Sequence, residues 1–163
     1  MHALTEAQIA SSLINATQSE RKNITVPENF GETAWDAIDF YGFRDRKLAL
    51  AGYVIVELDG VPTGLVLRQA ESTPRARAQC SWCNDIKLPN DVVLFTAKRA
   101  GDAGRKGDTV GTLVCDRFQC NVNARKRPPL AYVGFDVEAA RVARVEAMRE
   151  HVTEFVRAVR DGR

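Results

Sequence analysis

All four cysteines of this 163-residue chain lie in two short pairs, Cys80-x2-Cys83 and Cys115-x4-Cys120. The segment between the pairs predicts a β-hairpin, because apolar runs at 91–99 and 108–115 flank a glycine-rich connection. A hairpin brings its ends together, so the two pairs can meet. Four thiolates at about 2.3 Å complete the coordination of a tetrahedral Zn²⁺ and leave no open position for water. The spacing therefore predicts a structural zinc site and argues against a zinc hydrolase.

Other uses of two cysteine pairs fit this sequence less well. The chain has neither a basic leader nor an apolar run of transmembrane length, so we expect a cytoplasmic protein without a membrane segment. Thiols stay reduced in the cytoplasm, which argues against two structural disulfides. A thioredoxin-like motif should follow a strand and open a helix, whereas loop-like sequence flanks Cys80 and Cys83 on both sides. An iron–sulfur cluster also takes four thiolates, and the cysteine count does not separate it from zinc. Zinc is the favoured cofactor.

The remaining sequence predicts a mixture of helices and strands. Helices are expected at 5–20, where Thr5 and Gln8 form a capping box, and at 33–41. Strands at 53–58 and 63–69 form one predicted hairpin, and those at 91–99 and 108–115 form another, joined by a mobile basic loop at 100–107. Pro128 and Pro129 limit any helix after Cys120 to one or two turns. Asp136 is the expected N-cap of a long final helix.

Together these elements predict an α+β fold. Its expected parts are an antiparallel β-sheet, a treble-clef-like four-cysteine zinc finger and a long C-terminal helix. An apolar stripe along the final helix, from Val145 to Val159, is expected to dock on the sheet. We predict one domain over 1–163, with an N-terminal helical segment (1–48), a β-rich zinc-finger core (49–135) and the C-terminal helix (136–161).

The cysteine region resembles a known family. Cys-x2-Cys, a basic glycine-containing hairpin and GTLVCDRFQCN at 111–121 are similar to the treble-clef zinc-finger domain of the elongation factor G-binding proteins, which include FusB-type fusidic acid resistance proteins. The resemblance implies a zinc site at Cys80, Cys83, Cys115 and Cys120. It also implies a surface that binds elongation factor G and helps it leave the ribosome. The resistance proteins carry an additional N-terminal helical bundle, where this sequence predicts only one or two helices.

Three residues match positions that could serve such a surface: Trp82 in the knuckle, Lys106 on the hairpin loop and Tyr132 after the last cysteine. An aromatic side chain on a metal-fixed turn suits an interface anchor, and a lysine on a glycine-rich loop steers an acidic partner. We expect the knuckle and the 98–107 loop to form one surface. It would present Trp82 surrounded by Lys98, Arg99, Arg105 and Lys106.

Two other functions remain to be weighed. Basic residues outnumber acidic ones between Lys98 and Arg127, so a zinc finger that binds RNA, on or off the ribosome, is the alternative. Its phosphate contacts would be Arg99, Arg105, Lys106, Arg117, Arg125, Lys126 and Arg127. An enzyme is not expected, because His2 is terminal, His151 lies in the final helix beside the apolar stripe, and the sequence shows no catalytic constellation. The sequence makes no prediction of the oligomeric state.

Overall fold

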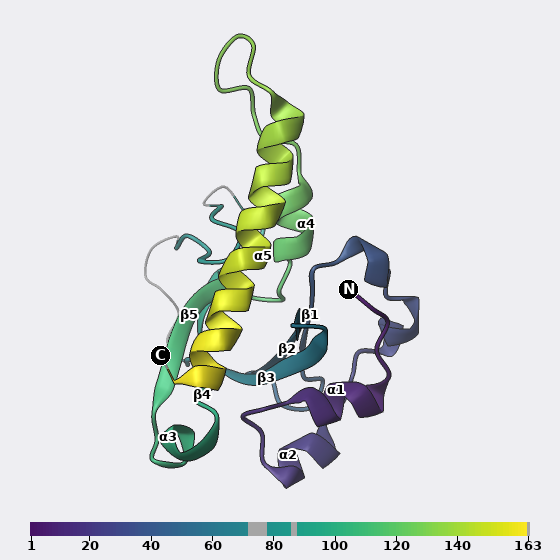
Figure 1. The fold of residues 1–163 in the computed structure, drawn as a ribbon, viewed down its shortest axis with the longest axis vertical. Helices are drawn as coiled ribbons and strands as arrows, with labels where there is room; N and C mark the ends of the chain where they lie inside the picture. The colour runs from purple at the N-terminus through teal and green to yellow at the C-terminus, as the bar shows by residue number, and fades with distance from the viewer. Residues whose placement is uncertain (72–77, 86–87, 163) are drawn as a thin grey trace.

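The computed structural model describes residues 1–71, 78–85 and 88–162 (Figure 1). In chain order the elements are α1 (Glu6–Ser12), α2 (Gln18–Asn23), the 3-10 helices η1 (Glu28–Glu32) and η2 (Trp35–Ala37), β1 (Phe40–Arg44), β2 (Ala51–Leu58), β3 (Val61–Gln69), β4 (Val92–Lys98), α3 (Gly101–Arg105), β5 (Thr109–Cys115), α4 (Cys120–Arg125) and α5 (Val137–Asp161). The predicted α+β class, with an antiparallel sheet and a long C-terminal helix, is confirmed.

The five strands form one antiparallel sheet in the order β1-β2-β3-β4-β5. Alternate side chains of its first three strands enter two different cores. One face packs Phe40, Val54 and Leu65 against α5, and the other packs Tyr41, Ile55 and Val66 against α1 and the η1–η2 region. Because both faces are covered, β2 reads as an almost unbroken apolar run, AGYVIVEL.

The sheet narrows where β3 meets β4. These strands pair only at Arg68 with Thr96 and at Gln69 with Phe95. Beyond that point the side chain of Asn15 lies between them. Its amide donates to the carbonyl oxygens of Val66 (3.0 Å) and Lys98 (2.9 Å), and its oxygen accepts from the Val66 N–H (2.8 Å). One side chain therefore satisfies the backbone groups that the diverging strands leave open.

The N-terminal third differs from the sequence prediction. The helix expected over 5–20 is two short helices, each with its own capping box, at Thr5–Gln8 as predicted and at Thr17–Glu20. The break lies where Leu13 pairs with Gly64 and Asn15 binds the sheet. The helix expected at 33–41 was wrong, because only η2 is helical and Phe40 already begins strand β1. The segment 1–48 is therefore not wholly helical.

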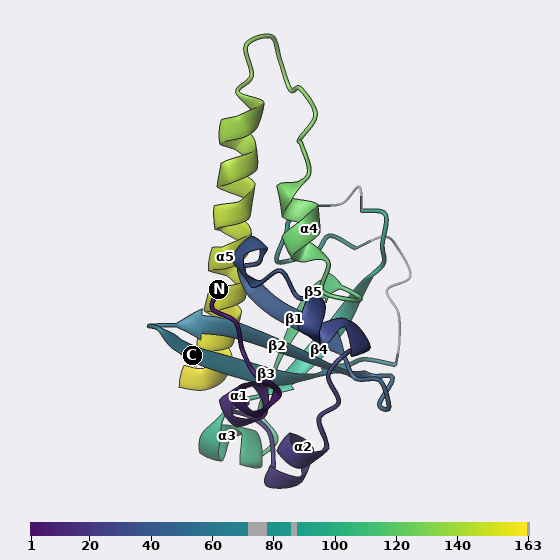
Figure 2. The ribbon, with the colours of Figure 1, turned by 90° about the vertical axis from the view of Figure 1, so that its right-hand side faces the viewer.

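The C-terminal third agrees with its prediction. Asp136 caps α5, with its carboxylate accepting from the Ala139 N–H (2.9 Å). Met148, Val152, Phe155, Val156 and Val159 are buried against the sheet. The first half of α5 extends beyond the sheet beside α4, and the connection at 126–136 forms the tip of this arm (Figures 1 and 2).

Candidate metal centre

The first cysteine pair is held in a tight turn against the end of the second hairpin. The Asn84 N–H donates to the Cys80 carbonyl (2.9 Å), and Asn84 adopts a positive φ of 53° that closes the turn. The Ser81 N–H donates to the Leu113 carbonyl (2.7 Å), which ties this knuckle to strand β5. Cys80 and Cys83 are both buried as a result.

The second pair lies where β5 ends and α4 begins. The Phe118 N–H donates to the Cys115 carbonyl (2.9 Å), and Phe118 has a φ of 60°, so the chain reverses between the two cysteines. The Phe118 ring covers two glycines of neighbouring strands. A Cβ atom at Gly42 or Gly52 would come within 2.6–2.7 Å of Phe118. These glycines leave the space that lets the second pair reach the sheet.

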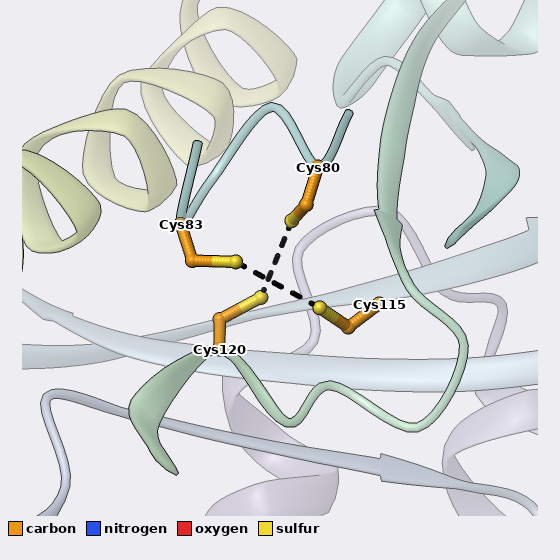
Figure 3. Close-up of side chains that lie close together, drawn as sticks. All are labelled: Cys80, Cys83, Cys115 and Cys120. Atoms are coloured by element: carbon orange, nitrogen blue, oxygen red, sulfur yellow. Dashed lines mark hydrogen bonds between the residues drawn. The ribbon is translucent and has the colours of Figure 1, made fainter. Parts of the chain in front are cut away.

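The four sulfur atoms converge on one point (Figure 3). All of them lie within 4.8 Å of one another, with the Cys80 and Cys120 Sγ atoms 3.5 Å apart and the Cys83 and Cys115 Sγ atoms 3.8 Å apart. In a tetrahedral zinc–thiolate centre with Zn–S bonds of about 2.3 Å, neighbouring sulfurs are about 3.8 Å apart. The arrangement therefore fits a zinc ion, with thiolates as the whole ligand set.

The sulfur atoms also change one another's acidity. The pKa of Cys80 lies below its ordinary value, because its sulfur accepts hydrogen bonds from Cys115 and Cys120. The pKa of Cys120 lies above its ordinary value, because hydrogen bonding with Cys115 and Cys80 favours its protonated form. A cation at the centre removes this competition by binding all four sulfurs as thiolates.

The sequence prediction missed the residues that surround the sulfurs. The Asn123 amide nitrogen lies 3.5 Å from the Cys115 Sγ and 3.0 Å from the Asn90 Oδ1. Asn121 fixes α4 to the edge of β1, donating to the Phe40 carbonyl (2.8 Å) and accepting from the Asp39 N–H (2.9 Å). The sequence did contain a signal for these residues. Asparagine is disfavoured within helices, so two asparagines in the six-residue segment of α4 indicate a specific hydrogen-bonding role.

Trp82 is a core residue rather than an exposed anchor. Its side chain is 1% exposed, and its ring packs on Phe40, Phe118 and Phe155 at centroid distances of 5.5–6.1 Å. Its carbonyl contacts the His151 Nδ1 on α5 (3.0 Å). The expectation that the metal-fixed turn would present this ring to solvent was wrong, because α5 covers the knuckle.

The surface expected to join the knuckle and the 98–107 loop does not form either. Val92 pairs with Cys115 at one end of the β4–β5 hairpin and Lys98 pairs with Thr109 at the other. The knuckle therefore lies at the opposite end of the hairpin from the loop, and part of that loop is the helix α3. Arg99 is half-buried, and its guanidinium binds Asp108 (3.0 Å) and donates to the Ala158 carbonyl (2.5 Å).

The other candidate residues lie on the surface at separate places. Lys98, Arg105 and Lys106 are exposed at the α3 end of the hairpin, where Arg105 forms an ion pair with Asp102. Tyr132 is 66% exposed at the tip of the arm, next to the exposed side chains of Leu130 and Val133. No helix of the described residues has both the length and the apolar character needed to cross a membrane.

Comparison with known protein families identifies the family to which a chain with this metal centre belongs. A model of the FBP C-terminal treble-clef zinc-finger family matches residues 8–159, which is nearly the whole chain. The chain belongs to this family. Its knuckle, hairpin and α4 form the treble clef, and its four cysteines are positioned to bind the zinc ion. The resemblance noted in the sequence is thereby confirmed, and it extends well beyond the cysteine region.

A solved structure of the fusidic acid resistance protein FusC has the same fold. It aligns with a TM-score of 0.55 at 19% sequence identity, over 76% of this chain and 53% of FusC. The family member described here therefore spans about half the length of FusC. No curated protein matches the sequence.

Proposed function

We propose that this chain is a non-enzymatic binding module that recognises elongation factor G in the cytoplasm. The family match over residues 8–159 carries the proposal, together with the four-cysteine centre. All four ligands of the centre are protein thiolates, so a zinc ion there has no free position for a substrate or a water. Its role is to hold the knuckle, β5 and α4 together as a rigid base for a binding surface.

Two exposed regions are the candidates for this surface. The first is the apolar tip of the arm, where Leu130, Tyr132 and Val133 are exposed. The second is the cationic end of the β4–β5 hairpin, with Lys98, Arg105 and Lys106. An exposed aromatic residue suits an interface anchor, and cations favour encounter with an acidic protein. Trp82 is excluded from direct contact because it is buried, and Arg99 is a weak candidate because its half-buried guanidinium already binds Asp108.

Titration calorimetry of the purified chain with elongation factor G tests the proposal. We expect binding at micromolar concentrations, and Tyr132→Ala should weaken it by about 2 kcal/mol if the ring is an anchor. Val61→Ala is the matched control, because Val61 is similarly exposed (61%) at the β2–β3 turn, far along the chain from the tip. Lys106→Glu should mainly slow association, whereas Lys47→Glu on the β1–β2 turn should not.

RNA binding is the competing outcome. Of the cations that it would use, Arg125 forms an ion pair with Asp39 (2.7 Å) and Arg99 one with Asp108, both with largely covered side chains. These pairs leave fewer free cations for phosphates, which favours the protein partner. If ribosomal RNA binds with a steep dependence on salt while the factor gives no heat at micromolar concentrations, the RNA function replaces the one proposed.

A further inference from the structure

Strand β5 forms one edge of the sheet, and hydrogen bonds on both of its sides reveal which residues face outward. The Arg99 N–H donates to the Asp108 carbonyl (3.0 Å), and the Asp116 N–H donates to the Asp91 carbonyl (3.0 Å), so the backbone N–H and C=O groups of even-numbered β5 residues point toward β4. The backbone groups of odd-numbered residues point the other way, and the Leu113 carbonyl accordingly accepts from the Ser81 N–H outside the sheet. Thr109 and Gly111 therefore point their backbone groups away from the sheet.

This edge is only partly paired. The knuckle takes the position opposite Leu113, and within the described residues no backbone group pairs with Gly111 or Thr109. Both residues are exposed. An open row of N–H and C=O groups is a template for an added strand. Gly111 has no side chain to obstruct a neighbouring backbone.

A shallow groove runs beside the open edge. Leu94, Leu113, Phe155 and Ala158 form its apolar part together with Trp82. Its polar lining is Ser81, Thr112, His151 and Glu154. Leu94 and Leu113 are cross-strand partners, so their side chains lie together on one face. An extended segment pairing with Gly111 could place an apolar side chain there.

The other end of the edge is cationic. Lys98 is the cross-strand partner of Thr109, and Lys106, at the end of α3, lies three residues before Thr109 in the sequence. Arg105 and Arg99 are neutralised by Asp102 and Asp108. The two lysines form no ion pair within the described part of the chain, so this end of the edge retains uncompensated positive charge.

We propose that the open edge of β5 binds an extended acidic segment of the protein partner as an added strand. Backbone hydrogen bonds to Thr109 and Gly111 hold the segment, an apolar side chain lies over Leu94 and Leu113, and a carboxylate lies near Lys98 and Lys106. A second copy of this chain fits less well, because β5 itself carries no acidic residue to meet the lysines. The inference rests on the proposed function, since it describes how the factor is recognised.

A proline at the edge provides the direct test. Gly111→Pro removes an N–H that faces outward and leaves the pairing with β4 intact, because edge positions tolerate proline. Gly111→Ala is the control, since its Cβ would lie 3.4 Å from the Leu94 Cδ1, an ordinary contact. In calorimetry with elongation factor G we expect the proline variant to bind at least tenfold more weakly and the alanine variant to bind like the wild type. Zinc content and thermal unfolding should be unchanged in both.

Hydrogen exchange of the wild type gives a test that needs no variant. The amides of Thr109 and Gly111 should exchange quickly in the free chain and become protected in the complex. Equal binding by the proline and alanine variants, or unprotected amides in the complex, would overturn the added strand while leaving factor binding intact. A dimer of the free chain that Gly111→Pro dissociates would overturn it in favour of a second copy.

Failure of the function can be separated from failure of the edge. A wild-type chain that gives no heat with the factor refutes the proposed function. The edge is then tested alone with a short peptide of alternating valine and glutamate. Protection of the Thr109 and Gly111 amides by this peptide supports the edge site. In Gly111→Pro, which has no amide at 111, the protection of Thr109 should be lost, and it should be weakened by Lys98→Glu but not by Lys47→Glu. Absence of protection refutes it.

Discussion

Asn15 acts as a bridge at the narrowest part of the sheet. Its amide group makes three hydrogen bonds to the backbone of β3 and to the end of β4, where the strands themselves no longer pair. Replacement by alanine leaves these backbone groups without partners. The two bonds to Val66 are partly buried, and a group left unsatisfied there costs about 1–3 kcal/mol, whereas water can replace the exposed bond to Lys98.

We therefore expect Asn15→Ala to lower the free energy of unfolding by about 1–3 kcal/mol. Urea denaturation followed by circular dichroism measures this change. Asn29→Ala is the control, because Asn29 is exposed at η1. If the two variants are equally stable, the bridge contributes nothing to stability.

Asp45 is a second residue whose position gives it a defined role. Its carboxylate accepts from the N–H groups of Lys47 (2.7 Å) and Leu48 (2.9 Å) and from the Tyr53 hydroxyl (3.0 Å). Burial alone would raise the pKa of Asp45, but these hydrogen bonds outweigh it and hold the pKa below its usual value. Burial and the same carboxylate raise the pKa of Tyr53.

This depressed pKa makes stability depend on pH in a defined direction. The stabilisation by ionised Asp45 is complete above the ordinary aspartate value of about 3.9 and is lost as the pH falls through the lower folded value. Asp45→Asn should therefore reduce stability at neutral pH and flatten its decline below about pH 4. Thermal unfolding between neutral and acidic pH measures both effects. A variant that declines as steeply as the wild type would assign the acid sensitivity to other carboxylates.

Among the elements, the β5–α4 turn depends on a close fit to its neighbours. Phe118 fits only because β1 and β2 carry glycines beneath its ring. A Cβ at Gly52 would come within 2.7 Å of Phe118, and the ring would have to move together with the turn that carries Cys115 and Cys120.

Gly52→Ala should accordingly lower stability by about 1–3 kcal/mol, as overpacking does, and speed the loss of zinc to a chelator. A coloured chelator measures the release rate. Gly31→Ala provides the comparison, because no atom lies within 4 Å of its Cβ. Zinc release from Gly52→Ala at the wild-type rate would show that the ring moves without disturbing the ligands.

At the scale of the whole molecule, the metal centre joins the knuckle, the end of β5 and the start of α4. The β4–β5 hairpin pairs with β3 at only two ladder positions, although its apolar side chains share the core of the first three strands, and Asn121 and Arg125 bind α4 to the β1 region. Structural zinc in small modules contributes about 10–16 kcal/mol of apparent binding free energy, so its loss should be felt across the molecule.

Chelation should therefore lower the unfolding temperature and expose β4, β5 and α4 before the other strands. Residues of β1, β2 and β3 that face α1 have their own apolar core and should keep their protection longest. Hydrogen exchange with and without chelator measures this order. Cys115→Ser should reproduce the chelated pattern, and a uniform loss of protection would contradict it.

Much of this protein could be predicted from local sequence patterns. The cysteine spacing gave the four ligands, and the three- and four-residue repeat gave the buried face of α5, because metal ligation and helix burial depend on residues close in sequence. The strands β2 to β5 follow from β-branched apolar runs. The length of α4 follows from Pro128 and Pro129. Strand β1 was missed because Trp35 and Ile38 also fit a helical period.

The relative placement of these elements does not follow from local sequence patterns. Trp82 is buried because α5 returns from the far end of the chain to cover the knuckle, and the knuckle is separated from Lys106 by the length of the hairpin. The helix expected over 5–20 breaks after Ser12, because Leu13 pairs with Gly64 and the Asn15 amide reaches two strands that lie far away in the sequence. Each of these outcomes depends on non-local packing, in which the free energy gained by burial and backbone pairing overrides local propensity. Local patterns were enough for the four ligands, strands β2 to β5 and helix α5, whereas non-local packing set the N-terminal elements and the residues that face the solvent.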